Sequence, residues 1–467
     1  MLAVLTGDEM RAADAAALST VSHQTLVERA GTAVGQAALG LMGGGYGRRV
    51  VVVAGKGSNG ADGRVAAAFL ARRGARVILI DAAAAPATLP RSDLVIDGAY
   101  GTGFRGSYDA PAVPPGTHVL AIDIPSGVDA DTGAAPGAPF HATLTVTFAA
   151  YKPGLLQGAG PGLSGEVCLA DIGIPLPPSR AGLIEDADID AWLPRRPRQS
   201  HKWSTALGVA AGSVGMEGSA VLCTRGALGA GAGMIRLGSP GNPAAQWPIE
   251  AVRVSLDELH WARPFLSATE KCQAMVVGPG LGTDDATQVE IREVIARSPH
   301  PLVVDADGLT ALAALGDAKA ARQLLAGRTA PTVLTPHDGE FARLAGSPPG
   351  DDRLAAARDL AERLGVIVLL KGPLTAVASP PGSSAESSPD VLLAGAGVPA
   401  LATAGTGDVL SGVIGAFLAR GVPAHRAAAL AAHVHGRAAQ RGRLEGLVAG
   451  DLPDLVASCL SEARHNG

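Results

Sequence analysis

Apolar runs that end in loops of Gly, Asp, Asn, Ser or Pro recur along the whole chain. In the first half, apolar and β-branched runs predict buried parallel strands at 50–54, 76–80, 94–97, 118–122 and 142–148. Apolar residues at helical spacing predict a helix over roughly 6–42 and another that starts at Asp62. This alternation of strands and helices indicates a mainly parallel α/β sheet with helices on both faces.

A change of composition divides the chain near residues 175–200. The proline-rich "IPLPPSR" is followed by the charged "IEDADIDAWLPRRPRQSHK", as in an inter-domain connection. Beyond it, new strand-and-loop units begin, among them "LGVAAGSVG", "AMVVGPGLG", "PLVVDADGL" and "GVIVLLKGP". We therefore expect two α/β/α domains, residues 1–197 with a linker from about 175, and residues 198–467.

Composition and charge exclude several classes of protein. Aromatic residues are only 3% of the chain, so we expect the two cores to consist of closely packed Ala, Val and Leu. A net charge of -5 argues against a nucleic-acid binder. The four cysteines lie far apart, so neither a zinc site nor a disulfide framework is indicated. No leader and no apolar run of ~18 residues is visible, which predicts a soluble, cytoplasmic protein without a membrane span.

The loop "GKGSNGADG" over 55–63 connects a predicted strand to a helix. Its glycines allow positive φ and close backbone approach, so its N–H groups and the helix N-terminus could face an anion. A tight turn in an ordinary α/β domain would explain the glycines alone. Three further polar loops follow predicted strands: "DGAYGTGFRG" from Asp97, "DIPSGVDADTG" from Asp123, and "YKPGL" over 151–155. Because parallel strands end at one edge of a sheet, we expect these loops to converge on one crevice.

The first half, about residues 1–175, resembles the NAD(P)H-hydrate epimerase domain, also called the YjeF N-terminal domain, in these loops. In that family the opening loop is usually N-N-G-G-D-G, whereas this chain has S-N-G-A-D-G; the alanine is tolerable only with φ below zero. The resemblance implies a Rossmann-like fold and Asp123 as the acid/base near C6 of the hydrated nicotinamide. It implies a K⁺ ion on oxygens of Asn59, Asp97 and Ser126. The residues implied to contact the hydrate are Ser58, Asn59, Gly60, Ala61, Asp62, Gly101, Thr102, Gly103, Phe104, Arg105, Gly106, Ser107 and Asp123.

The segment "LATAGTGDVLSGVIGAFLARG" over 401–421 is the most specific motif in the chain. Gly405, Thr406 and Gly407 open a helix, and their N–H groups could form an anion hole for a transferring phosphoryl group. Asp408 could then accept the proton of an attacking hydroxyl. An N-cap role would explain Asp408 alone, but not the residues before it. This motif is typical of ribokinase-like proteins.

Residues 198–467 resemble the NAD(P)H-hydrate dehydratase domain of ribokinase-like fold, most specifically in "TPHDGE" at 335–340. The resemblance implies that Asp408 is catalytic and that Ser219, Gly282, His337 and Asp408 contact the hydrate. Lys371, Gly372, Pro373, Leu374, Thr375 and Gly407 would bind ADP or ATP as co-substrate, with Mg²⁺. "HKWSTALG" at 201–208 and "GAGVPALAT" at 395–403 depart from the family pattern, but neither includes Asp408.

The resemblance as a whole implies a bifunctional repair enzyme, expected to be a homo-oligomer. The first domain would interconvert the R and S hydrates of NADH and NADPH (NADHX and NADPHX), and the second would dehydrate the S form. Two alternatives stay open. One is a ribokinase-like vitamin kinase with an accessory domain, which would leave a stable phosphorylated alcohol. The other is a non-catalytic nucleotide sensor, against which the presence of both Asp123 and Asp408 argues.

Overall fold

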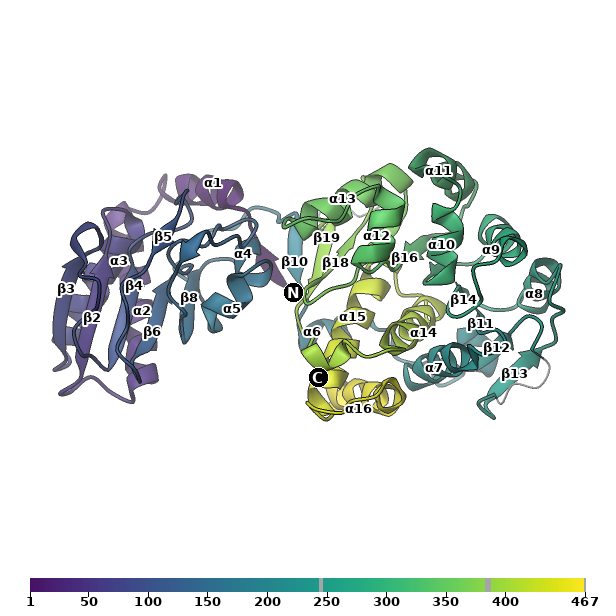
Figure 1. Cartoon of the computed structure of the whole chain (residues 1–467). Helices are drawn as coiled ribbons and strands as arrows, with labels where there is room; N and C mark the ends of the chain where they lie inside the picture. Colours follow the sequence, from purple (N-terminus) through teal and green to yellow (C-terminus); the bar gives the residue numbers. More distant parts are fainter. Residues whose placement is uncertain (243–246, 383–387, 466–467) are drawn as a thin grey trace. The chain divides into compact units, whose positions relative to one another are not determined.

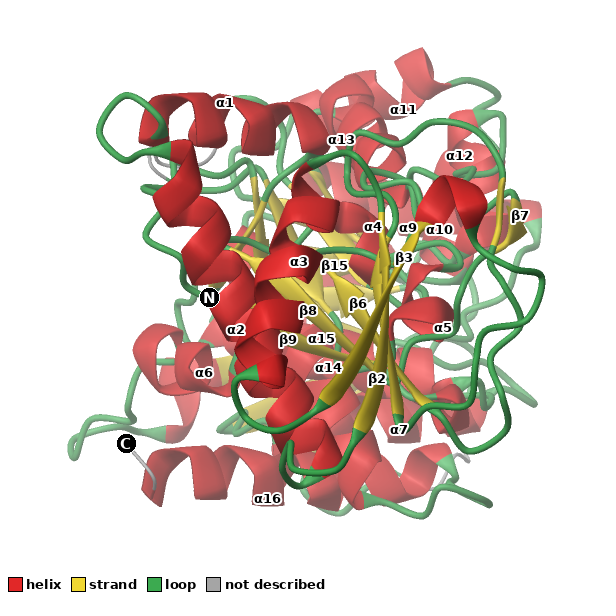
Figure 2. Ribbon diagram, turned by 90° about the vertical axis from the view of Figure 1, so that its left-hand side faces the viewer, coloured by secondary structure: helices red, strands yellow, loops and turns green. Residues whose placement is uncertain are grey.

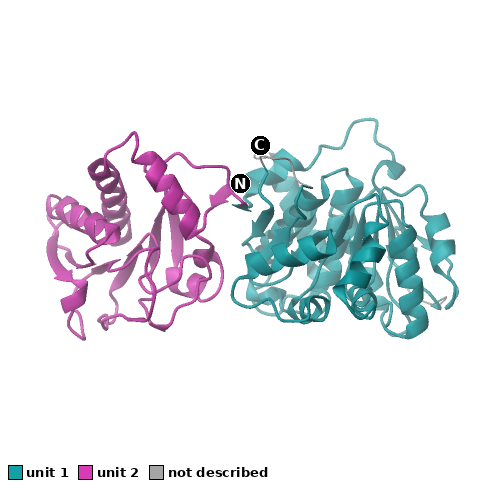
Figure 3. Cartoon of the chain, turned by 90° about the horizontal axis from the view of Figure 1, so that it is seen from above, with its two compact units in different colours: residues 1, 181–467 teal, residues 2–180 magenta. Residues whose placement is uncertain are grey.

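Two compact units make up the chain in a computed structural model that describes residues 1–242, 247–382 and 388–465. One unit comprises residues 2–180, and the other comprises residue 1 with residues 181–467 (Figure 3). The units divide after Arg180, at the start of the stretch that the sequence suggested as a linker, and not at 197.

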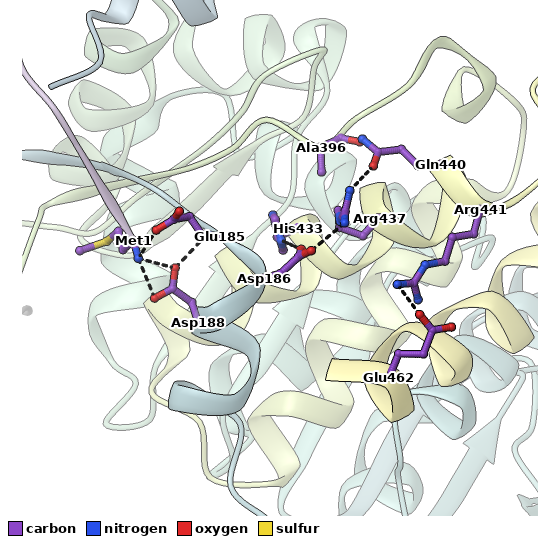
Figure 4. Close-up of polar contacts among 10 residues, drawn as sticks. All are labelled: Met1, Glu185, Asp186, Asp188, Ala396, His433, Arg437, Gln440, Arg441 and Glu462. Carbon is purple, nitrogen blue, oxygen red and sulfur yellow. Dashed lines mark hydrogen bonds and ion pairs between the residues drawn. The ribbon is translucent and has the colours of Figure 1, made fainter. Parts of the chain in front are cut away.

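The segment 181–192 is built into the larger unit, although its proline-rich and charged surroundings resemble a linker. Residues 181–183 form a strand that pairs with residues 391–393. The next helix carries Asp186, whose carboxylate lies 2.8 Å from Nε2 of His433 and accepts a hydrogen bond of 2.6 Å from Arg437 (Figure 4). Because these partners lie more than 200 residues away in the sequence, local composition does not reveal them.

The smaller unit contains a parallel sheet with the strand order β3-β2-β4-β6-β8-β9. Helices α1, α2 and α3 contribute to the core on one face, and α2 and α3 lie side by side (Figure 2). Residues of loops, such as Leu89 and Phe140, pack on the other face with Val51 and Val95. The strands are β1 Leu2–Val4, β2 Arg49–Ala54, β3 Arg76–Asp81, β4 Leu94–Gly98, β5 Tyr108–Asp109, β6 His118–Ile122, β7 Gly137–Ala138, β8 Leu144–Phe148 and β9 Glu166–Ala170; the helices are α1 Gly7–Ala17, α2 His23–Met42, α3 Ser58–Ala71, α4 Pro153–Leu156 and α5 Gly160–Ser164.

The helix expected over 6–42 is in fact two helices. The hydroxyls of Ser19 and Thr20 donate to the carbonyls of Ala16 and Ala17, which ends α1. Ser22 then caps α2 by accepting a hydrogen bond of 3.1 Å from the amide of Thr25. The predicted strands of this half are confirmed, with β8 starting two residues later than expected.

The larger unit is built on a long sheet with the strand order β10-β19-β18-β17-β16-β15-β14-β11-β12-β13 (Figure 1). β18 runs antiparallel to both of its neighbours, and the other pairs are parallel. The strands are β10 Ala181–Leu183, β11 Ala206–Ala210, β12 Met234–Gly238, β13 Ala251–Val254, β14 Ala274–Val277, β15 Leu302–Val304, β16 Thr332–Leu334, β17 Ile367–Leu370, β18 Thr375–Ala378 and β19 Val391–Ala394.

Helices α7, α14, α15 and α16 pack together and share one apolar cluster with the sheet. Its members are largely Ala, Val and Leu, as the composition predicted. The helices are α6 Asp186–Trp192, α7 Glu217–Gly229, α8 Ala262–Ala268, α9 Asp285–Arg297, α10 Asp307–Ala313, α11 Ala318–Ala326, α12 Asp338–Ala345, α13 Arg353–Leu364, α14 Thr406–Ala419, α15 Ala424–Arg441 and α16 Leu452–His465.

The strand order of each sheet marks a crevice. In the smaller unit the chain runs outward from β2 to β3 in one direction and returns to β4 on the other side. In the larger unit the same reversal separates β11 from β14. Ligands of open α/β sheets bind at such points, outside the carboxyl ends of the strands. Across the described ranges, no helix is both long and apolar enough to cross a bilayer.

Candidate active sites

The glycine loop after β2 is shaped by close backbone contacts. A Cβ at Gly55 would lie 1.9 Å from the carbonyl oxygen of Ala99, and one at Gly60 would lie 2.0 Å from the carbonyl oxygen of Gly55. Neither glycine adopts a positive φ, so close approach is the reason for both. Ala61 also has φ below zero, which confirms that alanine fits there.

Asn59, Asp97 and Ser126 all lie at this edge of the sheet. The Asn59 amide donates to the carbonyl oxygens of Ile122 at 2.6 Å and Tyr100 at 3.3 Å. The Oδ1 atom of Asn59 faces Gly101, and a Cβ at Gly101 would lie only 2.4 Å from this oxygen. The hydroxyl of Ser126 donates to Asp97 at 2.6 Å, and the Ser126 amide donates to the second oxygen at 2.8 Å. Tyr100 links Asn59 to this pair, because its carbonyl oxygen accepts from Asn59 and its amide donates to the Ser126 hydroxyl at 2.8 Å.

Burial dominates the electrostatics of Asp97, whose side chain is inaccessible to solvent. It raises the pKa of Asp97 to about 6, against hydrogen bonds from Ser126 and Ala99 that lower it. A nearby cation would stabilise the charged form of this buried carboxylate.

Asp123 sits directly after β6 with a φ of 66°, in the left-handed region that non-glycine residues rarely adopt. The ammonium of Lys152, wholly buried, donates to the Asp123 carboxylate and, at 2.9 Å, to the hydroxyl of Thr147. Thr147 itself donates to Asp123 at 3.1 Å. Asp123 is thus held in one orientation by partners from β8 and the loop after it.

A second carboxyl group of the crevice, that of Asp62, is 5% exposed. Burial, with smaller contributions from Asp123 and Asp14, raises the pKa of Asp62 to about 8. At neutral pH Asp62 therefore carries a proton while standing near a carboxylate that Lys152 pairs. A protonated Asp62 gives the crevice a proton donor, which suits acid–base chemistry.

The predicted substrate loop 101–107 follows β4 and is largely exposed. Phe104 packs on Tyr100 with ring centroids 4.4 Å apart, and Arg105 donates to carbonyl oxygens of the loop itself. Arg105 also lies 3.6 Å from a carboxylate oxygen of Asp129. The loop lies beside the Asn59–Asp97–Ser126 cluster through Gly101, and its remaining residues extend outward.

In the larger unit, α14 begins as the motif predicted. Gly405 precedes it with a φ of 87°, and Asp408 lies in its first turn, near Ser219 on α7. Burial, followed by the charge of Asp305, raises the pKa of Asp408 to about 6. Gly282 donates its amide to Asp307 at 2.8 Å, in the loop after β14.

A buried ion pair lies beside this helix N-terminus. Nζ of Lys371 lies 2.6 Å from one oxygen of Asp305, and the hydroxyl of Ser411 donates to the other at 2.7 Å. Lys371 follows β17 and Asp305 follows β15, so both come from strand ends at the same edge.

A cavity of about 670 Å³ opens on the other side of Gly407. Among its lining residues are five of the six predicted nucleotide residues and His337, which caps α12. The exception is Leu374, whose side chain is buried away from it. Apolar side chains dominate the remaining wall: Val398, Pro399, Leu401, Ala402 and Leu410. This chemistry fits a planar heteroaromatic ring next to an anion-binding helix N-terminus.

Both halves match known families. The model of NAD(P)H-hydrate dehydratase matches residues 207–461, and that of the YjeF-related protein N-terminus matches 23–87 and 80–154. The chain is 42% identical over 458 residues to the bifunctional NAD(P)H-hydrate repair enzyme Nnr of Mycobacterium tuberculosis, covering 90% of each chain. The chain belongs to the family of bifunctional NAD(P)H-hydrate repair enzymes. The Nnr of Mycobacterium leprae is 40% identical over 489 residues, with 97% of each chain covered.

Solved structures agree with the fold of the larger unit. A ribokinase-like superfamily protein from Enterococcus faecalis superposes with a TM-score of 0.52 at 22% identity, covering 62% of this chain and 98% of that protein. The ribokinase-like fold predicted for this member of the repair-enzyme family is therefore confirmed.

Sequence reasoning missed several polar residues of both sites in this repair-enzyme chain. Lys152 lies in "YKPGL", and Asp305 and Asp307 lie in "VVDADGL", two loops that directly follow apolar strands. A polar residue in a loop directly after an apolar strand is the sequence signal that could have found all three. His435 gave none: it lies within α15, is 6% exposed and lines the cavity, and its Nε2 has no partner among the described residues.

Proposed function

We propose that this chain epimerises the R and S hydrates of NADH and NADPH and dehydrates the S form at the expense of ADP or ATP. One observation supports the proposal beyond family membership: each unit places an acidic residue among polar side chains at the carboxyl edge of its own sheet. Asp123 is held by Lys152 and Thr147. Asp408 lies in the first turn of α14, within reach of the charges of Asp305 and Lys371. Two separate sites suit two separate reactions.

In the smaller unit, Asp123 would move the proton at the C6 hydroxyl of the hydrate, with Asp62 as the proton-bearing neighbour. Residues 58–62, at the start of α3, would bind the phosphates and ribose, and the loop 101–107 would cover the hydrate. A K⁺ ion fits the oxygens of Asn59, Asp97 and Ser126, because a large monovalent cation needs only oxygen ligands and little formal charge. Bound there, it would supply positive charge beside the substrate phosphates.

In the larger unit, Asp408 would take the proton of the C6 hydroxyl while that oxygen attacks the terminal phosphoryl group of the nucleotide. The bond between that phosphorus and the bridging oxygen breaks, and AMP or ADP leaves. Loss of the C5 proton and cleavage of the C6–O bond then release phosphate and form the C5=C6 double bond of NADH or NADPH. The N–H groups of 405–408 would stabilise the transferring group.

The nucleotide would occupy the 670 Å³ cavity, with its base against Val398 and Leu410 and its phosphates toward Gly407 and Lys371. Ser219, Gly282 and His337 would contact the hydrate. No three His, Cys, Asp or Glu side chains of the described ranges cluster closely enough to hold a metal ion. Mg²⁺, which binds by one or two carboxylates plus substrate phosphates, would arrive with the nucleotide. The homo-oligomeric state and the cytoplasmic location stay predictions.

The test is recovery of the near-ultraviolet absorbance of the reduced nicotinamide from purified hydrates, with ADP and with ATP. The proposal expects recovery from the S hydrate at once and from the R hydrate through epimerisation. A stable phosphorylated product without recovered absorbance would instead support the vitamin-kinase alternative. No consumption of hydrate or nucleotide would contradict both.

A further inference from the structure

The buried carboxylate of Asp305 is bonded on both sides by groups of the dehydratase site. Asp305 is 1% exposed. One of its oxygens lies 2.6 Å from Nζ of Lys371, which follows β17. The other oxygen accepts a hydrogen bond of 2.7 Å from the hydroxyl of Ser411 on α14. Asp305 thus connects the strand end that carries Lys371 to the helix that carries Asp408.

The backbone around Asp305 is shaped to allow this placement. Ala306 has a φ of 49°, which alanine rarely adopts. A Cβ at Gly278 would lie 1.9 Å from the carbonyl oxygen of Asp305, so the neighbouring loop approaches as closely as glycine permits. The next acidic residue, Asp307, accepts a hydrogen bond of 2.8 Å from the amide of Gly282. A residue that only filled the core would need neither the strained turn nor the close approach.

Lys371 is held against the start of α14. A Cβ at Gly407 would lie 3.4 Å from Nζ of Lys371, while the side chain of Lys371 is 21% exposed and lines the nucleotide cavity. The ammonium therefore lies between the buried Asp305 and the place where the phosphates are proposed to bind.

We propose that Asp305 is a positioning residue of the dehydratase reaction, which fixes the Lys371 ammonium at the N-terminus of α14 for the nucleotide phosphates and places a negative charge beside Asp408. This inference rests on the proposed function of that site. A free lysine side chain has many rotamers, and holding it in one geometry lowers the cost of binding the phosphates.

Titratable groups face Asp408 from four elements: Asp305 after β15, Asp307 on α10, Lys371 after β17 and Cys223 on α7. After burial, Asp305 is the largest cause that raises the pKa of Asp408, and Lys371 lowers it. Burial opposes the charge on Lys371, but Asp305 and Glu340 outweigh it and raise the pKa of that ammonium. Removing the charge of Asp305 therefore lowers the pKa of Asp408.

The experiment compares the full chain with Asp305→Asn, Lys371→Met, the double variant and the control Asp317→Asn. Asp317 is exposed and caps α11, a role that Asn performs equally well, so this control should match the parent. Asp305→Asn should raise KM for the nucleotide on the order of tenfold to a hundredfold. The pKa of about 6 for Asp408 predicts an acid limb of kcat/KM near pH 6 in the parent, and in Asp305→Asn this limb should move down by roughly 0.5–1 pH unit.

Asp305→Asn leaves Lys371 without its partner and could fail to fold for that reason. The double variant, which lacks both charges, then still tests whether Asp305 acts through Lys371. In the Lys371→Met background, Asp305→Asn should raise KM no further, because the group that it positions is gone; additive effects would overturn the proposal. Unchanged or lower KM with an unmoved acid limb in a folded Asp305→Asn variant would also overturn it. An inactive parent would instead contradict the proposed function itself.

Discussion

The buried ammonium of Lys152 is bonded to the carboxylate of Asp123, which stands at the end of β6 in a left-handed backbone conformation. The pair joins the end of β6 to the loop after β8. Since Thr147 donates to the same carboxylate oxygen at 3.1 Å and the amide of Phe148 donates to it at 3.3 Å, Asp123 cannot rotate without losing three partners.

Asp123→Asn should abolish epimerisation and leave dehydration of the S hydrate unchanged. Loss of a general base typically costs on the order of 10²–10⁴ in rate. Lys152→Met should also slow epimerisation, because it removes the cation that orients Asp123. Asp81→Asn, an exposed change that retains a capping side chain at the following turn, is the matched control. The measurement is R-to-S interconversion followed by chromatography. Normal epimerisation by Asp123→Asn would remove Asp123 from the mechanism.

Asp62 should make the smaller unit less stable as pH rises. Its pKa is about 8 in the folded chain and about 4 in an unfolded one, so between these values the folded state holds the extra proton. Stability that is present below pH 4 is therefore lost progressively up to pH 8, by at most about 1.4 kcal/mol per pH unit. Asp62→Asn should flatten this slope in denaturant unfolding of the full chain at several pH values. Parallel slopes for parent and variant would show that Asp62 is ionised throughout.

The sequence predicted the strands and the edge where the sites lie, because apolar runs and the loops after them are local features. The positions of three loops after strands predicted that they converge, and the family resemblance singled out Asn59, Asp97 and Ser126 within them. The sequence could not predict that Ala306 adopts a positive φ or that Lys152 is wholly buried, since both depend on contacts between distant loops. Nor could it predict that residues 181–192 belong to the larger unit, whose partner strand lies at 391–393.

A K⁺ site on Asn59, Asp97 and Ser126 should make epimerisation depend on K⁺. Exchange of K⁺ for a bulky organic cation should slow the parent enzyme, and Asp97→Ala should be slow in both buffers. Dehydration of the S hydrate by the same samples serves as the internal control. Equal epimerase rates in both buffers, with Asp97→Ala fully active, would show that these residues only satisfy turn N–H groups.

Gly412 should not tolerate a side chain. A Cβ there would lie 2.0 Å from the carbonyl oxygen of Cys223, at the crossing of α14 and α7, so Gly412→Ala must push the two helices apart. We expect a destabilisation of about 1–3 kcal/mol and a loss of dehydration. Gly218→Ala, on α7 with no atom within 4 Å of the new Cβ, should leave stability unchanged or slightly raised. Equal unfolding free energies for the two variants would contradict the observed helix crossing.

If one chain carries two independent active sites, two full-length variants that each lack one site should complement each other. Asp123→Asn retains the dehydratase site and Asp408→Asn retains the epimerase site. Supplied with R hydrate and ADP or ATP, each variant alone should recover reduced nicotinamide no faster than spontaneous epimerisation or dehydration allows, whereas their mixture should approach the rate of the parent. Rapid consumption of R hydrate by Asp123→Asn alone, or a mixture no faster than its components, would contradict the account.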